Sequence, residues 1–114
     1  MSHFKIELLN DSKKPEIDNG IYRCYAYEDG VIPPKTGSLI NLGFKLQVPK
    51  EYFIHVFSTS VKSLGGVGDS DYRGIYNLIV YNDKDTPLSY KKNEYVGNFC
   101  LIKVKTPVIE VINE

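Results

Sequence analysis

Short stretches in which apolar and polar residues alternate recur along the chain. One lies at 4–8 (FKIEL) and another at 44–48 (FKLQV), within the longer strand-like segment 38–49 (SLINLGFKLQVP). A period of two residues is typical of half-buried β-strands. The run YFIHVF at 52–57 is apolar on both faces, which favours a strand in the interior of a sheet. The pattern therefore predicts β-structure rather than helix.

Further strands are expected where β-branched and aromatic residues cluster. These segments are 21–27 (IYRCYAY), 75–81 (IYNLIVY), the stretch that starts at 95 (YVGNFCLIKVK) and, after Pro107, 108–112 (VIEVI). Polar segments rich in Gly, Pro, Asn and Asp separate the strands and read as loops or turns, at 10–20, 28–37, 58–66 and 81–94. No stretch has helical periodicity. Residues 1–114 therefore predict one all-β domain, a sandwich or barrel of roughly seven to ten short strands.

Charge and hydropathy exclude some classes of partner. The chain has 14 Lys and Arg against 14 Asp and Glu, so no long-range field draws it to DNA or to an anionic membrane. Several tyrosines lie in the expected strands, but few basic residues lie between them, so we expect no nucleic-acid binding. No apolar run approaches the roughly 20 residues that span a bilayer. The N-terminus, MSHFKIELLNDSKK, is too charged for a signal peptide, which predicts a cytoplasmic protein.

The residues that commonly bind metals or act as nucleophiles are sparse. Cys24 and Cys100 form no CxxC pair and lie in strand-like runs, so two buried free thiols are expected. His3 and His55 have no cysteine nearby, which argues against a zinc site. Neither histidine belongs to a local signature for a serine or cysteine nucleophile.

The segment 65–74, GGVGDSDYRG, has the period of neither a helix nor a strand. Glycines bracket two carboxylates, a tyrosine and an arginine, and an apolar run follows. One interpretation is a β-hairpin whose Gly and Asp residues only satisfy turn geometry. The other is a turn that holds a ligand. In either case Asp71 and Arg73 are expected to be structural and to pair locally across the hairpin.

Four segments resemble, in the same order, the motifs of the trimeric dUTP pyrophosphatases (dUTPases). GVGDSDYRG resembles the third motif, GVIDxDYRG, and YRCYAYEDGVIPP resembles the first motif and the turn after it, DLYAxEDxxIPP. LGFKLQVPKEYF resembles the strand and turn before the second motif, and KKNEYVGNFCLI stands where the fourth, KKGDRIAQLI, is expected. The resemblance implies a β-clip, jelly-roll-like barrel that forms a homotrimer with nucleotide pockets between subunits. Family enzymes hydrolyse dUTP to dUMP and pyrophosphate with Mg²⁺.

Part of the family's site is kept. Asp69 stands where the resemblance places the aspartate that orients the attacking water and contacts the sugar. Tyr72 stands where a ring packs on the deoxyribose, and Gly66 also falls within the implied nucleotide-binding set. Ser60 is the serine that survives from the second motif, and Asn98 replaces the glutamine of the fourth.

Other positions depart from the family pattern. Arg23 occupies the place of the aspartate that orders the metal, and a cation there should repel Mg²⁺. In the second motif Arg-Ser-Gly becomes Thr59-Ser60-Val61, and in the fourth an arginine becomes Tyr95. The glycine-rich fifth motif is not found before Glu114. Arg23 is either a surface residue that covers an apolar face or a direct contact to an anionic ligand.

These departures predict a non-catalytic dUTPase-like protein that sequesters or senses a nucleotide, or that serves as a protein-interaction module. The alternative is an active dUTP diphosphatase with a substituted site. We expect no cofactor and no metal site, with Mg²⁺ needed only if the enzyme interpretation holds. Residues 106–114 are a candidate segment for strand exchange between subunits. The many Asn, Lys, Ile and Tyr residues favour a viral or phage protein, which would act in an infected host cell.

Overall fold

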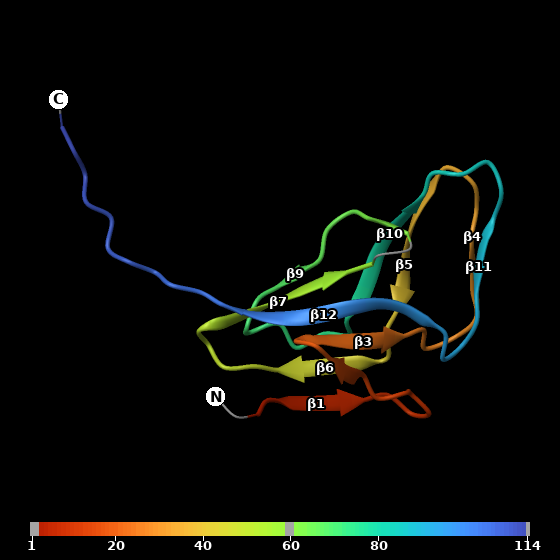
Figure 1. Ribbon diagram of the computed structural model, residues 1–114, viewed down its shortest axis with the longest axis horizontal. Helices are drawn as coiled ribbons and strands as arrows, with labels where there is room; N and C mark the ends of the chain where they lie inside the picture. The colour runs from red at the N-terminus through yellow and green to blue at the C-terminus, as the bar shows by residue number, and fades with distance from the viewer. Residues whose placement is uncertain (1–2, 59–60, 114) are drawn as a thin grey trace.

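A computed structural model describes residues 3–58 and 61–113, and within these ranges the chain forms β-strands and no helix. No helix long and apolar enough to span a membrane is found in the described ranges. The strands are β1 (Lys5–Leu8), β2 (Glu16–Asp18), β3 (Ile21–Tyr25), β4 (Gly30–Ile32), β5 (Thr36–Asn41), β6 (Phe44–Gln47), β7 (Tyr52–Phe57), β8 (Lys62–Ser63), β9 (Val67–Gly68), β10 (Asn77–Asn82), β11 (Leu88–Tyr90) and β12 (Tyr95–Lys103). The all-β prediction is confirmed (Figure 1).

The described strands form four antiparallel sheets. The largest has the order β2–β3–β12–β7–β9, and a second has the order β5–β10–β8. The pairs β1–β6 and β4–β11 complete the arrangement. Strand β12 crosses the front of the molecule in Figure 1 and pairs with β3 on one side and β7 on the other. Strand β7 lies between β12 and β9, as its apolar sequence predicts.

The core lies where the inward faces of these sheets meet. Alternation decides which side chains enter it, because successive residues of a strand point to opposite faces. Phe44 of β6 is fully buried, and its ring lies 5.8 Å from that of Tyr76 and 5.5 Å from that of Phe99 on β12. Cys24 is buried in this core as predicted, whereas Cys100 is only half-buried because it lies on the other face of β12; both thiols are free.

Four predicted loops contain strands. Segment 10–20 was expected to be irregular, but it contains β2, which pairs with β3 through Asp18↔Ile21. Asn19 and Gly20 connect the two strands with φ of 50° and 84°. Two consecutive residues at positive φ are typical of a type I′ hairpin turn, for which Asn-Gly is a strong signal. The sequence therefore contained the evidence for this hairpin.

The other missed strands are only two or three residues long, too short to show a periodic pattern. β4 and β11 lie in the predicted turns 28–37 and 81–94, and they pair with each other through Val31↔Ser89. β8 lies in the predicted loop 58–66 and pairs with β10. Conversely, 38–49 was interpreted as one strand-like segment but divides into β5 and β6, because the side-chain oxygen of Asn41 accepts the backbone N–H of Gly43 at 2.8 Å and bends the chain.

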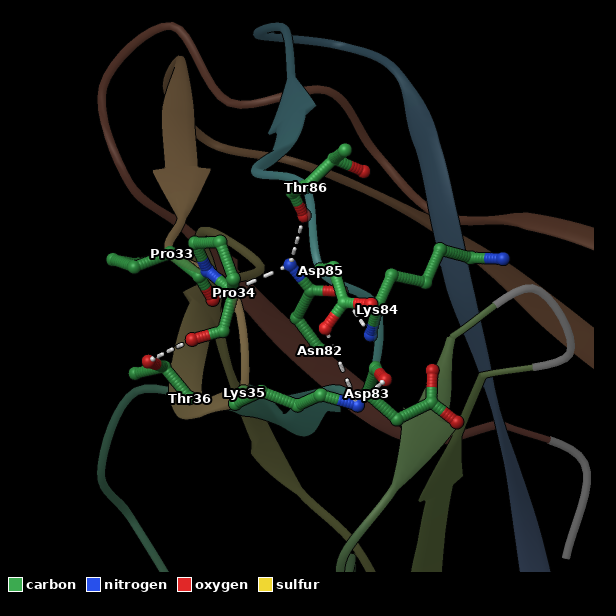
Figure 2. Close-up of polar contacts among 9 residues, drawn as sticks. All are labelled: Pro33, Pro34, Lys35, Thr36, Asn82, Asp83, Lys84, Asp85 and Thr86. Atoms are coloured by element: carbon green, nitrogen blue, oxygen red, sulfur yellow. Dashed lines mark hydrogen bonds and ion pairs between the residues drawn. The ribbon is translucent and has the colours of Figure 1, made fainter.

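Asn82 ties together two turns at the end of β10 (Figure 2). Its side chain is buried, and its amide nitrogen donates to the backbone carbonyls of Ile32, Pro33 and Thr86 at 3.1, 3.3 and 2.9 Å. Its oxygen accepts the backbone N–H of Lys84 at 3.2 Å. One amide thus binds carbonyls on both sides of the junction, those of Ile32 and Pro33 before β5 and that of Thr86 after β10.

The C-terminal segment leaves the body of the molecule after β12 (Figure 1). The backbone N–H of Val104 donates to the carbonyl of Glu51 at 2.7 Å. Beyond it, the predicted strand 108–112 forms no strand in the single chain, and its four apolar side chains are between 75% and 96% exposed. That prediction is wrong for the isolated chain, because a strand needs a partner and no sheet edge lies alongside.

Candidate functional site

The segment GGVGDSDYRG forms a tight turn on the edge of the largest sheet. β9 pairs with β7 through Ile54↔Gly68, and the chain then turns back at 69–72. The backbone N–H of Tyr72 donates to the carbonyl of Asp69 at 3.1 Å, which closes a four-residue turn. The turn is therefore present, with Asp69 and Tyr72 as its first and last residues. The β-hairpin interpretation is wrong, because the flanking strands β9 and β10 do not pair with each other.

Glycine is required at two positions of this segment, for two different structural reasons. Gly66 has a φ of 133°, and a Cβ there would meet the carbonyl oxygen of Val56 at 1.9 Å. Its own carbonyl accepts the N–H of Val56 at 2.6 Å, so β7 holds it closely. Gly68 has no positive φ, but a Cβ there would meet the hydroxyl of Tyr76 at 2.5 Å. Both positions bring the backbone of the turn against the core.

A cavity of about 610 Å³ opens beside the turn. Gly66, Asp69 and Tyr72, three of the predicted site residues, all line it. Apolar side chains of β5 and β10, Leu39 and Ile79, form another part of its wall. A cavity of this size, with apolar walls and a few polar groups, is typical of a site for a small molecule such as a nucleoside.

Arg73 braces the turn in a different way from the predicted one. Its guanidinium donates from Nη1 to the carbonyls of Ser70 at 2.6 Å and of Tyr72 at 3.1 Å. No ion pair joins Asp71 to Arg73 among the described residues. The predicted structural role of Arg73 fits these contacts, whereas the predicted pairing with Asp71 is absent there. The carboxylate of Asp71 instead lies on the cavity wall.

Sequence reasoning missed Tyr76 as part of this site. Its side chain is buried, lines the cavity and lies edge-on to Tyr72, with 5.1 Å between ring centroids. Its hydroxyl is buried and has no hydrogen-bond partner among the described residues. Burial raises the pKa of Tyr76 to about 12. An apolar interpretation of the run 75–81 gives no reason to expect a polar group under the turn.

Replacing Tyr76 with phenylalanine is expected to stabilise the free protein by about 1 kcal/mol, because a buried hydroxyl without a partner costs about that much or more. The raised pKa shows that burial disfavours the ionised tyrosinate even more than the neutral side chain, so it does not make the unpaired hydroxyl favourable. The wild type should therefore lose stability as the pH rises from about 10, the unfolded value, to about 12. Y76F should show less of this loss. Urea titrations at pH 7 and pH 11 measure both effects, and a less stable Y76F at pH 7 would contradict them.

Arg23 and Asn98 form a second group, away from the turn. They are cross-strand neighbours on β3 and β12, and Phe57 of β7 continues the same row. In the sheet, β12 and β7 separate β3 from β9. With strands spaced about 4.8 Å apart, Arg23 lies roughly 14 Å or more from the turn. One chain therefore does not bring all the predicted site residues together, and Ser60 lies outside the described residues.

Arg23 is held by an acid and an aromatic ring. Its Nε and Nη2 donate to the same carboxylate oxygen of Asp18 at 3.1 and 2.6 Å. Its Cζ lies 5.1 Å from the ring centre of Tyr95, within range of a cation–π contact. The hydrogen bond to Asp18 raises the pKa of Arg23 above its already high value, so the guanidinium stays charged.

Asn98 is 1% exposed although it lies on the sheet face opposite the hydrophobic core. The hydroxyl of Tyr95 donates to its Oδ1 at 2.6 Å, and this bond fixes the orientation of the amide. Its Nδ2 has no hydrogen-bond partner among the described residues. The Nδ2 donor of Asn98 is therefore unused but buried, on the strand next to that of Arg23.

The residues around Arg23 do not fit a magnesium ion. Mg²⁺ takes oxygen ligands, usually including one or two carboxylates. No cluster of three or more His, Cys, Asp or Glu suited to a metal occurs in residues 3–58 and 61–113. The nearby carboxylate of Asp18 is bound to the guanidinium, whose charge opposes a second cation. The expectation that the chain needs no metal nevertheless remains a prediction.

No model of a known protein family matches the chain, but individual relatives do. A deoxyuridine 5'-triphosphate nucleotidohydrolase of Paramecium bursaria Chlorella virus 1 is 27% identical over 100 residues, which cover 82% of this chain and 71% of the relative. The protein of the same name from Yarrowia lipolytica is 23% identical over 119 residues, with 95% and 76% covered. The one from avian adenovirus 8 is 29% identical over 96 residues, with 78% and 59% covered.

Solved structures agree with these relatives. The dUTPase of Staphylococcus bacteriophage 80alpha superposes with a TM-score of 0.89 at 16% identity, over 100% of this chain and 98% of that one. A mutant dUTPase from phage phi11 of S. aureus, which coordinates a structural Mg(II) ion, superposes with a TM-score of 0.88 at 15% identity, over 99% and 98%. At such identities the superpositions establish the fold alone.

The fold is therefore that of the phage dUTPases, as the sequence motifs predicted. The sequence relatives carry the identification further, because they bear the same family name as the structural neighbours. The chain is a dUTPase-like protein.

Proposed function

We propose that this dUTPase-like protein binds a nucleotide in the cavity beside the turn and does not hydrolyse it, so that it sequesters or senses the nucleotide. The proposal rests on a contrast between the turn, which keeps the residues for nucleotide contact, and the position of Arg23, which lacks the residue that would order a metal. Asp69 and Tyr72 line the cavity at the tip of the turn. Arg23 is bound to Asp18 at the position that the family pattern gives to a metal-ordering carboxylate.

The reason for expecting binding without turnover is electrostatic. Phosphoryl transfer depends on cations that neutralise charge on the phosphates and hold them in line with the attacking water. Asp69 retains a carboxylate that could orient the water. Without a carboxylate free to order Mg²⁺, the protein keeps ligand contacts but loses much of the stabilisation of the transition state.

We further propose that the site is completed in a homotrimer. In one sheet, β9, which leads into the turn, and β3, which carries Arg23, lie on opposite sides of the β12–β7 pair. A nucleotide held at the turn of one copy could meet Arg23 and Asn98 of another. Residues 106–114 are proposed to exchange between copies, since their apolar side chains are exposed in the single chain. A cytoplasmic location also remains part of the proposal.

An active dUTP diphosphatase is the second candidate. It is favoured by the retained Asp69 and by the relatives, which are named as nucleotidohydrolases. In that case the phosphates would have to be neutralised by groups that replace the family's set, and Mg²⁺ would be required. Turnover distinguishes the two candidates directly.

A panel of deoxynucleotides and ribonucleotides, tested by thermal melting with a pyrophosphate assay in the same wells, provides the test. At a concentration 100-fold above Kd, a bound nucleotide should raise the Tm by about 10 °C, because ligand binding adds about 2.7 kcal/mol. We expect such a shift for at least one nucleotide, with no pyrophosphate released. The isosteric variant D69N and the variant Y72A should lose the shift, while D85N should keep it.

The outcomes separate the hypotheses. Sustained pyrophosphate release with Mg²⁺ would establish the enzyme and contradict the proposal. A panel with no shift would favour a protein-interaction module. A shift that D69N and Y72A retain would place the nucleotide elsewhere on the molecule. Light scattering tests the trimer, and a monomer at every concentration would rule out shared sites.

A further inference from the structure

We propose that Arg23 and the side-chain amide of Asn98 form a binding site for the polyphosphate tail of a nucleotide, that this site needs no divalent cation, and that Asp18 occupies it in the free protein as a built-in competitor. The inference deepens the proposed nucleotide binding and rests on it for the identity of the ligand. It adds the chemistry of the anion site and the residue that regulates it.

The sheet places the relevant groups on one face. Glu16, Arg23 and Asn98 are paired across β2, β3 and β12. Residues paired in this way point to the same side of a sheet. Asp18 lies diagonally from Arg23, two residues along β2 from Glu16, and the tight turn at Asn19 and Gly20 fixes its position. The guanidinium, the amide and the competing acid therefore converge without any change in the backbone.

An anionic ligand can replace Asp18 in its ion pair with Arg23. Both side chains are about half exposed, at 45% and 42%. Ion pairs of this exposure contribute little to stability, because water screens them. A guanidinium carries five N–H donors, and Asp18 engages only Nε and Nη2 of Arg23. A pyrophosphate group carries more charge than a carboxylate and more acceptor oxygens, so it can replace Asp18 on the same donors.

Asn98 supplies the second donor. Its Nδ2 is buried and lacks a partner in the described chain. Leaving such a group unpaired is unfavourable, and a hydrogen bond to a ligand oxygen would offset that cost. Tyr95 joins the two donors, because its ring lies against Arg23 while its hydroxyl holds Asn98 Oδ1. The amide is thus fixed in orientation with its donor unpaired, and because that donor is buried, a ligand oxygen reaches it only when a covering side chain moves aside.

Of the two acids near Arg23, Asp18 is the one that competes with an anionic ligand for the guanidinium. Glu16 lies opposite Arg23, but its carboxylate accepts the hydroxyl of Tyr25 and lies 3.9 Å from the ammonium of Lys13. Lys13 and Arg23 together balance Glu16 and Asp18. Neutralising Asp18 alone leaves one net positive charge at the site, which favours an anion and opposes a metal ion.

Binding of inorganic pyrophosphate, measured by calorimetry in the presence of EDTA, tests the inference. We expect D18N to bind pyrophosphate about fivefold more tightly than the wild type, which corresponds to release of an exposed ion pair. R23Q should bind at least about tenfold more weakly, because a charge-assisted pair of hydrogen bonds is lost. R23K should fall between R23Q and the wild type. D85N, which removes a distant exposed acid, controls for net charge.

The results are distinguishable from failure of the proposed function. If D18N and D85N bind pyrophosphate equally, or if binding requires Mg²⁺ in every variant, the inference is overturned. Absence of pyrophosphate binding in both the wild type and D18N also overturns it. Nucleotide binding that depends on Asp69 but not on Arg23 would leave the proposed function intact and remove the anion site. Tm values of the free variants confirm that each one is folded.

Discussion

The variant G66A is expected to lower the free energy of unfolding by about 3 kcal/mol, one of the largest effects of any single substitution in this chain. The added Cβ would meet the carbonyl oxygen of Val56 at 1.9 Å, and Gly66 has a φ of 133° that side-chain-bearing residues rarely adopt. The neighbouring contact is backbone and cannot rotate away. The turn must then separate from β7, which also removes Asp69 from its place on the cavity.

Gly65 provides the matched control. A Cβ at Gly65 would lie 3.7 Å from Cδ1 of Ile79, an ordinary contact, and its φ is not in the left-handed region. G65A should therefore stay within about 0.5 kcal/mol of the wild type. Urea unfolding of the two variants measures the difference. Equal stability of G65A and G66A would show that β7 does not hold the turn as described.

The variant N82A should also lose about 3 kcal/mol, since three backbone carbonyls lose their donor and each hydrogen bond contributes about 1 kcal/mol. The loss arises at the junction of two turns that Figure 2 shows converging on one amide. N82D tests the chemistry without a change in size. Its carboxylate cannot donate to these carbonyls, so N82D should be least stable above the pKa of the introduced acid.

Asn77 lies on the same strand and serves for comparison. Its Nδ2 makes one long bond, 3.3 Å, to the carbonyl of Ile75. N77A should cost about 1 kcal/mol or less by the same measurement. If N77A and N82A are equally destabilised, the fully buried amide contributes no more to stability than the half-buried one, and the role assigned to Asn82 is wrong.

The sequence predicted the parts of the fold that depend on local pattern. Alternation at 44–48 and the apolar run at 52–57 both correspond to strands, β6 and β7. The short strands β4 and β11 could not be found in this way, because three residues are too few to show an alternating pattern, although Ile32, Leu88 and Tyr90 pack in or against the core. The strand expected at 108–112 failed for the opposite reason, since its side chains are apolar but no sheet edge receives them.

The candidate site could be predicted only where its residues are neighbours in the sequence. The turn with Asp69 and Tyr72 was apparent from one motif, and the structure places both residues on one cavity. Tyr76 could not be assigned, because its polar role depends on a hydroxyl that meets Gly68 across the turn. Asp18 could not be assigned either. Its link to Arg23 comes from a hairpin whose Asn-Gly signal was present but whose pairing brings the two side chains together only in space.

The C-terminal segment has a consequence for the protein's survival in a cell. An extended segment that exposes four aliphatic side chains is expected to be cleaved readily by proteases and to pair with strands of other polypeptides. Covering it against another surface would bury side chains worth about 1.5–3 kcal/mol each. We therefore expect the protein to resist proteolysis for longer when these side chains are buried against another surface than when they are exposed.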